Sequence, residues 1–174
     1  MKKRILTWLL AISMLGSLLT VPAGAAAVTK FSDVSDSYTA TAVETLRLMG
    51  VLDGYGDGTF RPDTILNRAQ FCKMAVYAMD GSEELGRYST VTIFPDVKPS
   101  HWASAYINMA AKKGIISGFA DGKFKPGQTV TAGQAVTILM RGLGYKDEDM
   151  GGVWPQSYMA EAQTNGLLKS TGIT

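Results

Sequence analysis

The chain has 174 residues, 46% of them hydrophobic and 18% charged, which is enough for one compact domain with a sizeable core. Its 17 Lys and Arg and 15 Asp and Glu give a net charge of +2. Three of the basic residues, Lys2, Lys3 and Arg4, lie at the start of residues 1–27. Without residues 1–27 the chain has 14 basic and 15 acidic residues and a net charge of −1. That balance excludes a basic field for nucleic acid. A single cysteine, Cys72, and a single histidine, His101, exclude a disulfide framework and argue against a multi-histidine metal site or a Ser-His-Asp triad.

Residues 1–27 have the composition of a secretory signal peptide. A basic start is followed by a largely apolar stretch at 5–21 and by small residues at 23–27 that fit a cleavage site. The alternative is an uncleaved membrane anchor, because about 17 apolar residues is near the lower limit for crossing a bilayer. The small-residue end favours cleavage, so we predict an exported protein that meets the membrane only through this signal.

The chain then contains one pattern twice, with matched positions 64 residues apart. The pattern has two glycines, an aromatic residue, an Asp-Gly turn, a phenylalanine, a proline and a glutamine. These are Gly50, Gly54, Tyr55, Asp57, Gly58, Phe60, Pro62 and Gln70 in the first copy and Gly114, Gly118, Phe119, Asp121, Gly122, Phe124, Pro126 and Gln134 in the second. Agreement at so many positions in one order identifies an internal repeat.

Each copy predicts a helix, a structured loop and a second helix. Gly50 and Gly114 stand where a helix ends in a left-handed residue, and the phenylalanine of each loop is expected to anchor the loop on the core. Each second helix begins with a capping box, formed by Asn67 and Gln70 in the first copy and by Thr131 and Gln134 in the second.

Apolar residues at helical spacing predict helices at 38–49 and 67–79 in the first copy and at 101–113 and 132–142 in the second. Cys72 falls among apolar neighbours in the second of these, so we expect a buried and inert thiol. Between the copies, residues 81–93 form a predicted linker, within which 91–93 could pair as a short extended piece.

A third copy begins near residue 145 and does not finish. Six positions match the second copy at an offset of 52 residues, namely Trp154, Tyr158, Ala162, Gly166, Leu167 and Leu168. No third Asp-Gly loop or capping-box helix follows before Thr174, so we expect a fragment, or a partner that supplies the missing half. The apolar face of the lone helix then lacks a cover, which predicts self-association or partial disorder after about residue 145.

Two opening motifs, Phe31-Ser-Asp33-Val34 and Phe94-Pro-Asp96-Val97, precede the copies. Together with the repeated loop and helix start, they make the chain similar to the S-layer homology (SLH) family. The resemblance implies an all-α fold of tandem helix-loop-helix modules, arranged as a pseudo-threefold helical spindle with an incomplete third module. The modules are then residues 31–80, 94–144 and, in part, 145–174.

The resemblance also implies a function. Members of the family hold exported proteins on the bacterial cell wall by binding secondary cell-wall polysaccharide, often pyruvylated, or peptidoglycan-linked polymers. Non-catalytic anchoring is therefore the first hypothesis, with no cofactor and no metal. Two alternatives stay open: the targeting part of a larger surface enzyme such as a wall hydrolase, and a protein–protein scaffold of a surface layer.

Arg68 is the residue that the resemblance identifies as the contact to an acidic glycan. A guanidinium offers a planar pair of donors to a carboxylate, and a helix N-terminus adds positive potential. The second copy has Ala132 at this position, and Asn67 and Gln70 replace the usual Thr and Glu. We expect Arg68 to be exposed, so that Arg68→Ala would weaken binding without unfolding the protein.

The remaining candidates follow from the same pattern. Tyr55 and Phe119 are expected to offer rings to sugars, and the helix-start residues Asn67, Gln70, Thr131 and Gln134 complete the predicted glycan site. Trp102 and Trp154 could stack on sugars, but their matched helical positions favour core packing. The Asp-rich stretch at 53–58 lacks calcium ligands at positions three and twelve, so we predict a structural turn there.

Overall fold

A computed structural model of the chain describes residues 30–79, 82–169, 171 and 173, and over these residues it is helical with no strand. The elements are α2 (Ser37–Leu48), α3 (Arg68–Ala78), η1 (Ser82–Tyr88), α4 (Ser104–Lys112), α5 (Ala132–Gly142), η2 (Asp147–Asp149) and α6 (Gln156–Thr164), where η marks a 3₁₀ helix. The predicted all-α fold of tandem modules is confirmed. The predicted signal peptide lies outside the described residues, and none of the described helices is long and apolar enough to cross a membrane.

The helix ends follow the predicted chemistry. Gly50 adopts a φ of 71°, its N–H donates to Arg47 O at 2.9 Å, and the N–H of Val51 donates to Leu46 O at 2.9 Å. The same pair of bonds ends α4 at Gly114, which also has a φ of 71°. These bonds satisfy carbonyl groups that a helix end leaves without intrahelical partners, and only glycine takes this backbone conformation without strain.

The starts of α3 and α5 are capping boxes, as predicted. The Asn67 side chain accepts from the N–H of Gln70 at 2.9 Å, and the Gln70 side chain accepts from the N–H of Asn67 at 2.9 Å. Thr131 and Gln134 form the equivalent pair at the start of α5. By contrast, α4 begins at Ser104 instead of residue 101, and its start has no side-chain cap.

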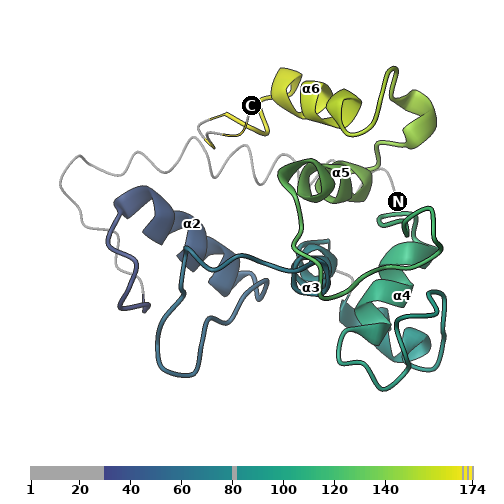
Figure 1. Cartoon of the computed structure of the whole chain (residues 1–174). Coiled ribbons are helices and arrows are strands. Elements are labelled where there is room, and N and C mark those ends of the chain that lie inside the picture. The colour runs from purple at the N-terminus through teal and green to yellow at the C-terminus, as the bar shows by residue number, and fades with distance from the viewer. Residues whose placement is uncertain (1–29, 80–81, 170, 172, 174) are drawn as a thin grey trace.

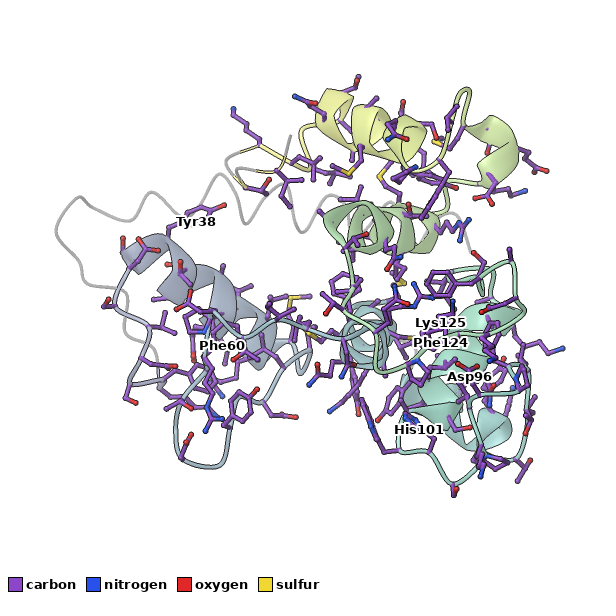
Figure 2. All side chains as sticks on the ribbon, viewed as in Figure 1. Tyr38, Phe60, Asp96, His101, Phe124 and Lys125 are labelled. Carbon is purple, nitrogen blue, oxygen red and sulfur yellow. The ribbon has the colours of Figure 1, made fainter. Side chains whose placement is uncertain are left out.

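A carboxylate from each opening motif holds each loop. Asp96 accepts from the N–H of Phe124 at 2.9 Å and from the N–H of Lys125 at 2.7 Å, and these three residues lie together in Figure 2. Lys125 has a φ of 58°, a conformation that costs energy for a side chain with a Cβ. Asp33 makes the same two bonds in the first module, at 2.7 and 2.6 Å. We call this carboxylate with its two backbone hydrogen bonds the loop clamp. It holds a strained turn in which Phe124 is completely buried.

The helices pack in a staggered order. The first helix of each later module lies on the second helix of the module before it, so that α4 packs on α3 and α6 packs on α5, while α3 and α5 also contact each other (Figure 1). The face of α6 that carries Tyr158 and Ala162 is buried against Val136 and Met140 of α5. Our expectation that this face lacks a cover was therefore wrong, because a helix of the second module supplies the cover.

Helix α2 stands apart from the other helices (Figure 1). It packs on its own loop in a separate cluster of Phe31, Val34, Ala40, Val43 and Leu52. Tyr38 lies on the side of α2 opposite to Phe60 and is 66% exposed (Figure 2). Among the described residues, no other helix makes an extensive contact with α2.

The predicted linker is structured. It contains η1, and the fully buried Asn108 of α4 donates from its amide to the carbonyl oxygens of Tyr88 and Val91. Residues 91–93 form no strand in the structure. The side chain of Asn108 supplies the hydrogen bonds that strand pairing would otherwise give.

The loop clamp leads to a first prediction. Asp96→Ala should lower the free energy of unfolding by about 1–3 kcal/mol, because two backbone N–H groups lose an ionised acceptor. Urea unfolding measures the loss, and Asp149→Ala, which removes an exposed carboxylate elsewhere, is the control.

The same clamp predicts a pH dependence. Burial opposes ionisation of Asp96, but the N–H groups of Phe124 and Lys125 outweigh it and hold the pKa below the ordinary 3.8. A lowered pKa means that the clamp stabilises the fold above pH 3.8 and that this contribution is lost as the pH falls through the folded-state pKa. The stability difference between wild type and Asp96→Ala should therefore shrink in acid, and a constant difference would contradict the clamp.

Candidate functional site

A cavity of about 520 Å³ lies where three modules meet. Its walls come from the second loop at 116–120, from α5, from residues 147–158 of the third module and from Arg68 at the start of α3. Three successive modules therefore contribute to one cavity, which we call the first cavity.

Arg68 is buried in the wall of the first cavity, with only 5% of its surface exposed. Its Nε donates to Phe124 O at 2.8 Å, and its two terminal nitrogens donate to Gln134 Oε1 at 3.2 Å and to Ser117 O at 3.3 Å. All three acceptors are neutral. Burial lowers the pKa of Arg68 below its ordinary value, yet a guanidinium keeps its proton in proteins. The wall thus contains a positive charge whose hydrogen-bond acceptors carry no negative charge.

Two aromatic rings fix the plane of this guanidinium. Its central carbon lies 4.6 Å from the ring centre of Phe119 and 4.5 Å from that of Phe124. Lys125 also contacts the Phe119 ring, at 4.4 Å. Cation–π contacts of this kind hold a cation in place without neutralising it.

A second arginine in the cavity wall has an acidic partner. Arg141 donates to both carboxylate oxygens of Asp147, at 2.8 and 2.7 Å, and to Ser117 Oγ at 3.1 Å. The hydroxyl of Tyr158 donates to the same carboxylate. The Tyr158 hydroxyl and Arg141 together hold the pKa of Asp147 below 3.8, despite partial burial. Arg141 is therefore hydrogen-bonded directly to a carboxylate, whereas Arg68 interacts with the nearby charge of Asp96 only through space.

Trp154 lies at the rim of the cavity and not in the core. It is 51% exposed, and its indole N–H donates to Thr137 Oγ1 at 3.0 Å. Trp102, at the matched position of the second module, is 54% exposed. The predicted core packing of both residues was wrong, because they lie in turns ahead of α4 and α6 instead of on the helix faces that pack.

A glycine allows the third module to approach α5 closely enough to shape this rim. A Cβ at Gly133 would lie 2.7 Å from Cγ of Pro155, which follows Trp154 directly. Any side chain at this position therefore requires Pro155 to move, and Trp154 would move with it.

Comparison with known proteins decides the family. The S-layer homology domain matches residues 30–72 and 93–136, together half of the chain. The chain belongs to the S-layer homology domain family. Over 148 residues it is 39% identical to a cell surface protein of Thermoanaerobacter kivui, a match that covers 83% of this chain and 19% of that protein.

Two further relatives have the same character. The chain is 32% identical over 146 residues to the middle cell wall protein of Brevibacillus brevis, covering 83% of this chain and 14% of that protein. It is also 32% identical over 120 residues to a cellulosome-anchoring protein of Acetivibrio thermocellus, covering 65% of this chain and 26% of that protein. The chain thus spans about a quarter or less of the length of these relatives.

The structure brings together part of the site expected for an SLH module. Arg68, Phe119 and Gln134 line the first cavity, whereas Tyr55, Asn67, Gln70 and Thr131 do not. Asn67, Gln70 and Thr131 use their side chains in the capping boxes, and the Tyr55 ring lies 4.0 Å from the guanidinium carbon of Arg61. The expectation that Arg68 is exposed was wrong, because the loop of the following module covers it.

Sequence reasoning missed Arg141 and Asp147. Neither belongs to a motif that the two complete SLH modules share, so the repeat gave no signal for them. Trp154 was recognised from its match to Trp102 but was assigned to the core instead of to the site. Cys72 is fully buried, and burial raises its pKa to about 12, which fits the predicted inert thiol. Among the described residues no cluster of His, Cys, Asp and Glu is suited to hold a metal.

The burial of Arg68 changes the expected effect of its removal. Arg68→Ala should lower the free energy of unfolding by about 1–3 kcal/mol, because Phe124 O, Ser117 O and Gln134 lose a charged donor. The control is Arg61→Ala, since Arg61 forms an ion pair of the first loop with about half of its side chain exposed. Urea unfolding compares the two variants, and equal losses would mean that the buried hydrogen bonds contribute nothing beyond those of an exposed arginine.

Proposed function

We propose that this SLH-family chain anchors an exported protein on the bacterial cell wall by binding an acidic wall polysaccharide in the first cavity. The observation that carries the proposal is the buried guanidinium of Arg68, whose hydrogen-bond acceptors are all neutral. An anion that enters the cavity gains the attraction of this charge without displacing an acidic side chain from it. The names of the relatives, which are surface, wall and anchoring proteins, support the cellular setting.

The chemistry of the cavity suits a sugar that carries a carboxylate. A guanidinium binds carboxylates through charge-assisted hydrogen bonds, and Arg68 uses three of its five donors within the protein. The exposed indole of Trp154 offers a flat apolar face at the rim, and Thr137 and Gln134 add polar groups. The volume of about 520 Å³ lies within the usual range for small-ligand sites. A secondary cell-wall polysaccharide with pyruvate groups, or an acidic polymer linked to peptidoglycan, has these features.

The proposed contacts are Arg68, Phe119 and Gln134, joined by Trp154. A direct contact of Tyr55, Asn67, Gln70 or Thr131 to glycan remains a prediction from the family resemblance. The capping-box residues support the site indirectly, because Gln134 Oε1 accepts both from the N–H of Thr131 and from Arg68.

Two alternatives remain for the whole protein. The chain spans a small share of its relatives, so these modules are also suited to target a larger surface enzyme or to join a surface-layer scaffold. We propose no catalytic residue within the chain. The gene's reading frame around this segment distinguishes the alternatives, because a hydrolase domain in the same frame would favour the enzyme.

Binding to wall polymer tests the site. Arg68→Lys should reduce affinity for the purified acidic polymer roughly tenfold, because an ammonium keeps the charge but cannot present the planar pair of donors. Calorimetric titration measures the affinity, and a melting curve for each variant checks folding. Arg87→Ala is the control, since its removal takes away a cation on η1 whose side chain is 80% exposed.

Chemical removal of the acidic groups from the polymer should weaken wild-type binding to a similar degree. Unchanged affinity in folded Arg68→Lys, together with equal binding of the neutralised polymer, would rule out Arg68 as an anion contact.

We also predict self-association, now through α2 instead of through the helix of the third module. Tyr38 and Leu48 of α2 and Ile65, which lies ahead of α3, are 66%, 72% and 75% exposed. We propose that two copies associate through the exposed end of α2 at Leu48. Sedimentation velocity should show a concentration-dependent dimer that Leu48→Glu dissociates and that Leu139→Glu, a change on α5, leaves intact. A monomer at all concentrations would contradict the proposal.

A further inference from the structure

A second cavity, of about 500 Å³, adjoins the first. Its walls include the end of α4 at Lys113, the turn after α5 at 144–146, and four residues that also line the first cavity, namely Ile116, Ser117, Arg141 and Asp147. The Arg141–Asp147 ion pair therefore forms part of the wall between the two cavities.

The charged side chains that line the second cavity are mostly positive. Lys113, Lys146 and Arg141 contribute three cations, against the single carboxylate of Asp147. Lys113 pairs with Glu84 at 3.0 Å and Lys146 with Glu148 at 3.2 Å, in contacts whose side chains are 41–72% exposed. Exposed ion pairs contribute little free energy, so both ammonium groups can turn to an anion at small cost.

The two residues of the Arg141–Asp147 ion pair differ in exposure. The side chain of Arg141 is 12% exposed and is fixed by Ser117 Oγ, whereas the side chain of Asp147 is 67% exposed and belongs to the three-residue η2. Asp147 can consequently swing into solvent while Arg141 keeps its place. A carboxylate from a ligand could then accept the same two N–H groups in the same bidentate geometry.

We propose that Asp147 is an internal substitute for a second acidic group of the wall polymer. An oligosaccharide bound at Arg68 in the first cavity extends past the Arg141–Asp147 pair, and its next acidic group displaces Asp147 and binds Arg141, Lys113 and Lys146 in the second cavity. The site thereby selects chains with two or more acidic groups over fragments with one. This inference rests on the proposed function and adds the second subsite and its selectivity.

The physical basis is the effective concentration of the second acidic group. A free anion competes poorly with Asp147, because Asp147 is attached to the protein and also accepts from Tyr158. Once the first acidic group is bound, the second is held nearby by the chain of the polymer, and its binding becomes intramolecular. A single acidic sugar lacks this advantage and leaves the Arg141–Asp147 ion pair intact.

The test compares wall-polymer fragments that carry one or several acidic groups, by calorimetric titration of the full chain. Wild type should bind the longer fragment at least roughly tenfold more tightly. Asp147→Asn, which keeps the size of the side chain but not its charge, should open the second subsite and raise affinity for the one-acid fragment several-fold. The double change Lys113→Ala and Lys146→Ala should lower the ratio of long- to short-fragment affinity.

Asp149→Asn is the matched control, because Asp149 is an exposed carboxylate of the same η2 that lines neither cavity. It should bind both fragments as wild type does, and melting curves establish that each variant is folded. Equal affinity for both fragments in wild type and in Asp147→Asn would overturn the second subsite and leave the proposed function standing. Failure of wild type to bind any acidic fragment would overturn both.

Discussion

The buried charge of Arg68 is the constraint on which the site depends. Taking a guanidinium out of water costs several kcal/mol unless its donors find acceptors with good geometry. Those acceptors are the carbonyl oxygens of Phe124 and Ser117 and the side chain of Gln134, all from the module after the one that contains Arg68. The second loop must therefore keep its shape and its distance from α3, and the first cavity keeps its shape with them.

That requirement explains why the loop is held so firmly. Asp96 binds the N–H of Phe124, the residue whose carbonyl accepts from Arg68. A Cβ at Gly118 would lie 2.7 Å from the ring of Phe94, so the loop also packs directly on the opening motif. One residue of the loop is thus fixed from both sides, by a carboxylate of its own module and by an arginine of the previous one.

The staggered packing places the site between modules instead of within one. Because α4 packs on α3 and α6 on α5, each junction combines a loop, a second helix and the start of the following module. Neighbour-to-neighbour contact of this kind is characteristic of repeat proteins. At the junction seen here, one arginine donates only to neutral acceptors and another is paired with Asp147, so the same residue type has two electrostatic environments in the wall of one cavity.

The sequence by itself determined the repeat, the helical class and the ends and starts of helices, because a left-handed glycine or a capping box acts within a few residues of the chain. Only the tertiary structure decided that Arg68 is buried, that α5 covers α6, that Trp154 faces a cavity and that Arg141 meets Asp147 beside it. Arg68 and Gln134 are 66 residues apart and still share a hydrogen bond. Such contacts depend on which modules pack against each other, and that packing cannot be predicted from a local pattern of residues.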